Sequence, residues 1–138
     1  MKKYLLVLFV FCLLISACAP QAASASIIGS WKLTSYGPAN SLAPAIPDVD
    51  ATLTFDKDGK LSGNGGCNSL GGEYKIKGDQ ITFGPVVSTL MACPDPQMAE
   101  EGIIHQVLTD TASFKVEGST LTITNNEMTL TLAAVIGK

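Results

Sequence analysis

Arginine is absent from this sequence of 138 residues. Its nine lysines are outnumbered by twelve aspartates and glutamates, which gives a formal net charge of −3. Arginine is the side chain best suited to bidentate contacts with phosphates and guanine bases. We therefore expect this acidic, arginine-free chain to bind neither nucleic acids nor nucleotides.

The chain also lacks an apolar run of the length that crosses a bilayer, which is about 20 residues. The run Tyr4–Ile15 has twelve residues, follows Lys2 and Lys3, and has the length of a signal-peptide core. It ends at Ser16-Ala17-Cys18, which resembles the cleavage site of bacterial lipoproteins. The resemblance implies that residues 1–17 are a signal peptide and that Cys18 carries acyl chains such as palmitate. An ordinary secretory signal or an uncleaved anchor are the alternatives.

Residues 18–26 are interpreted as the lipidated cysteine followed by a flexible tether, because Ala19–Ser26 shows no apolar periodicity. The residue after Cys18 is Ala19 and not Asp. By similarity to lipoprotein sorting rules, this implies the outer membrane in a bacterium with two membranes. In a bacterium with one membrane the protein is expected on the outer face of the plasma membrane. Residues 27–138 remain as one domain of ordinary size, expected to be monomeric.

This domain consists mostly of short runs in which apolar and polar residues alternate, with Gly, Asp and Asn between the runs. The predicted strands are Ser30–Tyr36, Ala51–Phe55, Lys60–Ser62, Glu73–Lys77, Gln80–Phe83, Ser113–Val116, Thr120–Thr124 and Met128–Leu132. In the first of them, Trp31, Leu33 and Ser35 are expected on one side. Gly37–Pro47 contains three prolines and predicts a long exposed loop. We expect an α+β domain, mostly antiparallel β, with a curled or barrel-like sheet of about seven to eight strands and one packed helix.

The helix is predicted from Pro96 to about Asp110, with Asp95 as its N-cap. Its expected apolar face consists of Ile103, Ile104, Val107 and Leu108. Glu100 and Glu101 lie early in the helix, where its dipole favours negative charge. His105, the only histidine of the chain, points about 130° away from the apolar face and is interpreted as a surface residue. A general base needs a partner and a pocket, so we expect no catalytic residue and no cofactor.

Two cysteines remain in the domain once Cys12 and Cys18 are assigned to the signal peptide and the anchor. Cys67 lies in the stretch Gly63–Asn68, and Cys93 lies just before the helix. Outside the cytoplasm a disulfide is favoured, with two free thiols or a metal or redox role as alternatives. No second histidine is present to complete a zinc site. We predict a Cα–Cα separation of about 4.4–6.8 Å. We expect the glycines to let the backbone bulge or pass close to the Cys93 segment.

In their order along the chain, these landmarks resemble those of the META domain, also called the HslJ-like domain. The matching motifs are Gly29-Ser30-Trp31, Gly66-Cys67-Asn68, Gly72-Glu73-Tyr74, Thr89-Leu90-Met91-Ala92-Cys93-Pro94 and Glu101 in the helix. They extend over residues 27–138. Leu90 stands where an arginine is common, so any role of that arginine is not carried over. The resemblance implies a small β-rich domain around one helix, found in bacterial envelope proteins linked to heat or antibiotic stress, without catalytic residues.

We therefore expect a non-enzymatic cell-envelope lipoprotein that contacts another envelope protein in stress tolerance or envelope maintenance. The loop Gly37–Pro47 is the predicted contact site, because loops on rigid scaffolds carry function. Two alternatives are a binding module for a small apolar ligand and a protease inhibitor acting through an exposed loop. In the ligand-binding alternative, some of the core aromatic residues line the cavity; the candidates are Trp31, Tyr36, Phe55, Tyr74, Phe83 and Phe114. Asp56–Gly59 faintly resembles a calcium loop but is interpreted as a hairpin turn.

Overall fold

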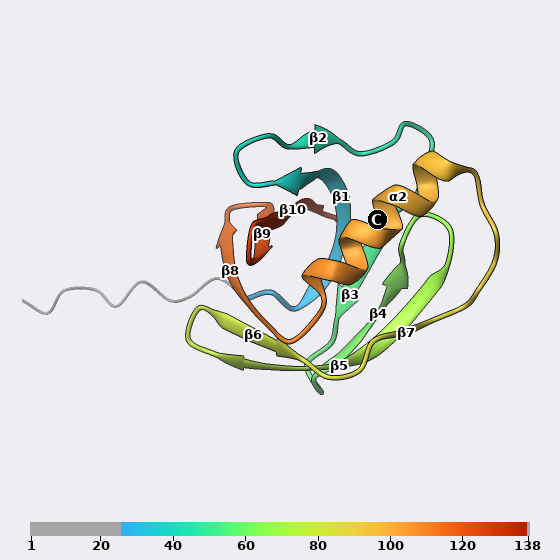
Figure 1. Cartoon of the computed structure of the whole chain (residues 1–138). Coiled ribbons are helices and arrows are strands. Elements are labelled where there is room, and N and C mark those ends of the chain that lie inside the picture. Colours follow the sequence, from blue (N-terminus) through green and yellow to red (C-terminus); the bar gives the residue numbers. More distant parts are fainter. Residues whose placement is uncertain (1–25, 138) are drawn as a thin grey trace, which may run out of the picture.

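The computed structural model describes residues 26–137. In this part of the chain, eight antiparallel strands close into a barrel (Figure 1). They are β1 (Gly29–Pro38), β3 (Thr52–Phe55), β4 (Lys60–Asn64), β5 (Ser69–Lys77), β6 (Gln80–Phe83), β8 (Thr111–Glu117), β9 (Thr120–Asn125) and β10 (Met128–Ala134). The barrel closes where β1 pairs with β10. Two short strands, β2 (Ala43–Pro44) and β7 (Val87–Ser88), pair with β1 and β5. The predicted barrel-like antiparallel sheet is confirmed.

Tight turns join the hairpins as their sequences predict. In the β3–β4 turn, the Asp56 Oδ1 atom accepts hydrogen bonds from the backbone N–H groups of Asp58 and Lys60, at 2.8 Å and 3.0 Å. Gly59 follows with a positive φ of 77°, a backbone conformation that glycine adopts without strain. The Asp56–Gly59 segment is therefore a hairpin turn, as interpreted.

The first strand departs from its predicted alternation. The β1–β10 register shifts between Leu33 and Ser35, so Tyr36 packs against the core where Ser35 was expected. Thr34 occupies the irregularity: its carbonyl accepts the Ala45 N–H at 2.9 Å. One extra residue in a strand reverses the faces of all later side chains, which explains the difference.

Helix α2 (Asp95–Val107) lies across one end of the barrel and packs against β1, β9 and β10 (Figure 1). It begins after Pro94, which occupies the N-cap position without a side-chain cap, so the predicted Asp95 cap is wrong. Ile104, Val107 and Leu108 are fully buried as expected, whereas Ile103 is half-buried. No helix in residues 26–137 is long and apolar enough to cross a membrane.

The interior of the barrel is filled by side chains. The largest fully buried apolar ones come from the strands, from α2 and from the residues that flank them: Phe55, Ile27, Ile81, Ile104, Leu108, Leu121, Ile123, Leu130 and Leu132. At the end opposite α2, Ile27 is held beneath Trp31, whose indole N–H donates to the Ile27 carbonyl at 2.7 Å. Phe55 and Tyr74 meet edge to face with ring centroids 5.2 Å apart. Four of the six predicted core aromatics are buried, while Tyr36 and Phe114 are partly buried.

Candidate functional site

The stretch Gly63–Asn68 ends β4 and forms the turn to β5, directly beneath α2. Gly65 N–H donates to the Asn68 carbonyl at 2.8 Å, and Gly66 N–H donates to the Asn64 side chain at 2.7 Å. A Cβ atom on Gly65 would lie 2.8 Å from the Glu101 carboxylate, and one on Gly66 would lie 3.1 Å from Glu100 Oε1. The glycines therefore make room for two helix glutamates. The backbone of this stretch also passes close to the Cys93 segment, as expected, since the Cα atoms of Cys67 and Cys93 are 6.1 Å apart.

Asn68 is buried and uses its whole side chain in hydrogen bonds. Its Oδ1 atom accepts from the Thr89 hydroxyl at 2.8 Å and from the Met91 N–H at 2.7 Å. Its Nδ2 atom donates to the Met91 carbonyl at 3.3 Å and to Glu101 Oε1 at 2.8 Å. One amide group thus connects the turn, the segment before α2 and the helix itself.

Glu101 fixes that amide from the helix side. Glu101 is 5% exposed, and its second carboxylate oxygen accepts the Asn68 backbone N–H at 2.7 Å. Both oxygens therefore accept from the same residue. A buried carboxylate is stable when its oxygens find such donors, so Glu101 ties α2 to the β4–β5 turn.

Glu100 is buried beside it, with 0% exposure. Its Oε2 atom accepts the Ile46 N–H at 2.9 Å, while Oε1 has no hydrogen-bond partner in the described chain. Burial raises the pKa of Glu100 above its ordinary value, and the Ile46 hydrogen bond opposes this only in part. Burial, followed by the nearby charge of Glu100, also raises the pKa of Tyr36.

The contact between Glu100 and Ile46 changes the interpretation of Gly37–Pro47. Gly37 and Pro38 belong to β1, and Ala43–Pro44 forms β2 against it. The segment is mostly exposed, as expected, but it is not a single loop, because strand pairing and the buried Glu100 carboxylate hold it onto the barrel.

Cys67 and Cys93 form a disulfide with Cα atoms 6.1 Å apart, which confirms the predicted pairing and separation. The bond holds one end of Thr89–Cys93, which we call the braced loop. At its other end, Thr89 N–H donates to the Ser69 carbonyl at 3.1 Å. Between these points Leu90 is 96% exposed. In Figure 1 the connection between β7 and α2 follows the outer margin of the molecule.

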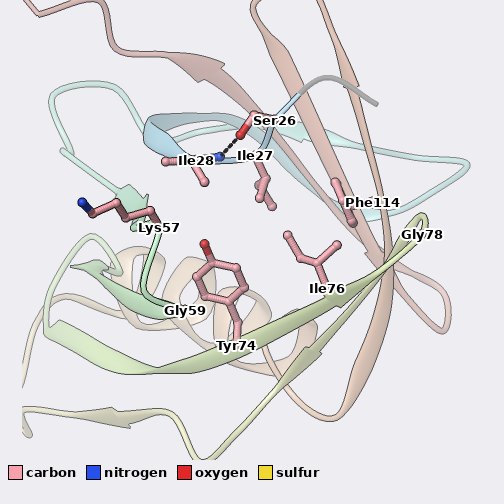
Figure 2. A pocket seen from close by; sticks show the side chains of 9 residues that line it. All are labelled: Ser26, Ile27, Ile28, Lys57, Gly59, Tyr74, Ile76, Gly78 and Phe114. Carbon is pink, nitrogen blue, oxygen red and sulfur yellow. Dashed lines mark hydrogen bonds between the residues drawn. The ribbon is translucent and has the colours of Figure 1, made fainter. Parts of the chain in front are cut away.

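A second feature is a pocket of about 380 Å³ at the barrel end opposite α2. Figure 2 shows Tyr74, Ile76 and Phe114 directed toward Ile27 and Ile28 across it. Burial, followed by the charge of Asp56, raises the pKa of Tyr74. Of the six aromatic residues proposed to line a ligand cavity, Tyr74 and Phe114 line this pocket.

His105 is half-buried, and so less exposed than expected. It lines a depression of about 340 Å³ together with Phe83, Pro85, Val86 and Asp110. In residues 26–137, no three His, Cys, Asp or Glu side chains cluster as metal ligands. The predicted signal peptide (1–17) and the lipid attachment site Cys18 lie outside the described residues.

The fold and the site together define a class: small closed antiparallel barrels crossed by one helix and braced by a disulfide. The model of the META domain family matches residues 25–135. The chain therefore belongs to the META domain family.

Solved structures agree with this assignment. An NMR structure of a protein from Burkholderia xenovorans is 30% identical, with a TM-score of 0.64, over 78% of this chain and 81% of that chain. A second NMR structure is 24% identical, with a TM-score of 0.64, over 77% and 88% of the two chains. A DUF4847 family protein from Bacteroides vulgatus, 16% identical, shares the fold with a TM-score of 0.55 over 76% and 91% of the two chains. Comparison with curated proteins gives no match.

Proposed function

We propose that this META-domain protein is a non-enzymatic, HslJ-like lipoprotein of the bacterial cell envelope. It acts by binding another envelope protein in stress tolerance or envelope maintenance. The observation that supports binding is the braced loop, where an exposed apolar side chain sits on a fixed backbone. Leu90 and its half-exposed neighbour Met91 are held in place from beneath by Asn68 and Glu101.

The buried Glu101 carboxylate is costly in itself. Moving a charged group out of water is unfavourable, and its hydrogen bonds with Asn68 offset that cost. Here the buried groups fix a surface segment, and residues 86–94 carry no charge. A preformed apolar segment loses little conformational entropy on binding, so this arrangement suits recognition by another protein.

The position of the N-terminus supports the same proposal. Residues 26–28 lie at the barrel end opposite α2, beside the pocket of Figure 2. The braced loop leads into α2 at the other end. An anchor at Cys18 leaves a tether of eight residues, Ala19–Ser26, which spans at most about 28 Å. With this anchor, the attachment point is at one end of the barrel and the braced loop is at the other, which leaves the loop accessible to a partner.

Site-specific photocrosslinking in intact cells tests the binding role. A photoreactive amino acid replaces Leu90 in the full-length protein, and a matched variant carries it at Ile136, which is 86% exposed. We expect position 90 to capture a discrete envelope protein that position 136 does not. Identical products from both positions, or none from position 90, contradict the proposal.

Membrane attachment is tested separately. The Cys18→Ala variant of the full-length chain is expected to leave the membrane fraction and to lose metabolic labelling with palmitate. Retention of the variant on membranes contradicts the lipoprotein assignment. It leaves the binding role of the loop untouched.

The barrel-end pocket favours a second candidate function, the binding of a small apolar ligand. Its volume of about 380 Å³ reaches the lower range of ligand sites, which begins at about 300 Å³. The test is titration with an environment-sensitive fluorescent fatty acid, in the wild-type protein and in Ile76→Asp. Saturable binding that Ile76→Asp abolishes supports this function, and its absence in the wild type excludes it.

A further inference from the structure

We propose that the braced loop is a substrate-like inhibitory loop for serine endopeptidases with an apolar primary pocket. The peptide bond Leu90–Met91 is the one presented to the enzyme. The inference rests on the proposed protein-binding role of this loop and specifies the class of partner.

The first argument is what the loop displays. Endopeptidases bind an extended segment mainly through its backbone and select it by one side chain that enters a pocket. Leu90 is 96% exposed, so its side chain is free to enter a pocket in full. Leucine is apolar, and no charged residue lies within residues 86–94. The loop therefore fits an apolar pocket and not one built for lysine or arginine.

The second argument is how the neighbours of Leu90 are held. The Thr89 hydroxyl and the Met91 N–H donate to the same atom, Asn68 Oδ1, at 2.8 Å and 2.7 Å. The Met91 carbonyl accepts from Asn68 Nδ2 at 3.3 Å. A single buried residue thus holds the Thr89 side chain before the presented bond and the Met91 backbone after it. Such a loop loses little entropy in an enzyme cleft and binds more tightly than a flexible substrate.

The chemistry of cleavage shows why the loop inhibits. The enzyme's serine hydroxyl adds to the Leu90 carbonyl carbon, and the enzyme's histidine passes the hydroxyl proton to the Met91 nitrogen. The bond between the Leu90 carbonyl carbon and the Met91 nitrogen then breaks. This leaves an ester between Leu90 and the enzyme and a new amino group on Met91.

In an ordinary substrate the amine departs and water hydrolyses the ester. Here Met91 stays attached through Asn68 and through the Cys67–Cys93 disulfide two residues later. Thr89, on the ester side, stays bound to Asn68 and Ser69. The amine is therefore held beside the ester at high effective concentration. Its attack restores the peptide bond and the free serine hydroxyl, so the complex persists.

Enzyme assays test the proposal with the full-length protein in mild detergent. The probes are chymotrypsin and subtilisin, which accept leucine, and trypsin, which requires lysine or arginine. We expect the wild-type protein to inhibit at least one of the first two and not trypsin. In Leu90→Lys, inhibition of chymotrypsin and subtilisin weakens by about 30-fold or more, as at a central contact residue, and inhibition of trypsin appears.

Ile136→Lys is the matched control, because Ile136 is also highly exposed, at 86%, and is expected to behave as wild type. Thermal melts check that both variants fold. Absence of inhibition by the wild-type protein, or its rapid cleavage after Leu90, overturns the proposal. So does an equal effect of the two lysine variants. If photocrosslinking from position 90 still captures an envelope protein, the inference fails while the proposed function stands.

Discussion

Glu100 and Glu101 are adjacent in α2 and both are buried, yet their carboxylates are satisfied to different degrees. Glu101 accepts two hydrogen bonds from Asn68. Glu100 accepts one, from Ile46, and its other oxygen has no partner within residues 26–137. The same substitution at the two positions should therefore have opposite consequences.

For Glu100→Gln we predict a change in the pH dependence of stability. Burial raises the folded-state pKa of Glu100 above its ordinary value of 4.5. The unfolded state therefore loses its proton first as the pH rises, and the wild type loses stability until the pH has passed the raised pKa. The variant lacks this decline, so its free energy of unfolding should rise relative to wild type between pH 4.5 and neutrality. Urea unfolding across this range measures it, and parallel profiles would refute the prediction.

For Glu101→Gln we predict a loss of stability. Both Glu101 oxygens face N–H donors of Asn68, so either orientation of a glutamine places its NH₂ group against a donor. Asn68 cannot turn over to compensate without losing its contacts to Thr89 and Met91. The unmet hydrogen bonds should cost roughly 1–3 kcal/mol. Urea unfolding at neutral pH gives the value, and a variant as stable as wild type would show that this contact is dispensable.

These buried glutamates could not be predicted from the sequence by apolar pattern alone. Glutamate early in a helix is ordinarily a solvated residue that favours the helix dipole. A usable indication was spacing, because Glu100 lies four residues before Ile104 and eight before Leu108, on the buried face. The other indication was Gly65-Gly66, whose missing side chains leave space for two carboxylates.

Within α2, the element that crosses the barrel, Gly102 lowers the stability of the helix. Gly102 is exposed, and a Cβ atom added to it meets no atom within 4 Å. Alanine in an exposed helix interior is more stable than glycine by about 0.8–1 kcal/mol. We predict that Gly102→Ala raises the free energy of unfolding by about this amount. Thermal unfolding measures it, and a lower melting temperature would contradict the assignment of Gly102 to an open helix surface.

The strands show why some elements follow from sequence and others do not. The hairpin turns at Asp56–Gly59 and Gly78-Asp79 are local, and turn residues specify them within a few positions. The irregularity in β1 is not local, since pairing with β10 sets it from nearly a hundred residues away. For the same reason, the local sequence does not predict β2 or the hydrogen bond between Ile46 and Glu100.

At the scale of the molecule, the disulfide closes a loop with a sequence separation of 26 residues. The chain-entropy model gives roughly 3–4 kcal/mol for such a closure, a large share of the roughly 5–15 kcal/mol of a whole domain. We predict that Cys67→Ser with Cys93→Ser lowers the free energy of unfolding by about this amount. Denaturant titration measures it. A loss below about 1 kcal/mol would mean that the disulfide adds little to the brace.

The barrel, the single helix of the described chain and the Cys67–Cys93 bond could be predicted from the sequence. Hydrophobic period, turn residues and cysteine count are local or compositional properties. The braced loop could not be predicted in this way. Leu90 becomes a presented side chain only because Asn68, Glu101 and the disulfide meet beneath it. Such a site depends on contacts between segments distant in the chain.

Asn68 holds the braced loop from beneath through its hydrogen bonds to Met91. Hydrogen exchange at the Met91 amide, which donates to Asn68 Oδ1, measures this support. We predict a protected Met91 amide in the wild-type protein. In Asn68→Ala it should exchange rapidly, while the barrel amides of β9 stay protected. A Met91 amide that exchanges in the wild type as fast as in an unstructured peptide would show that Asn68 does not hold the loop.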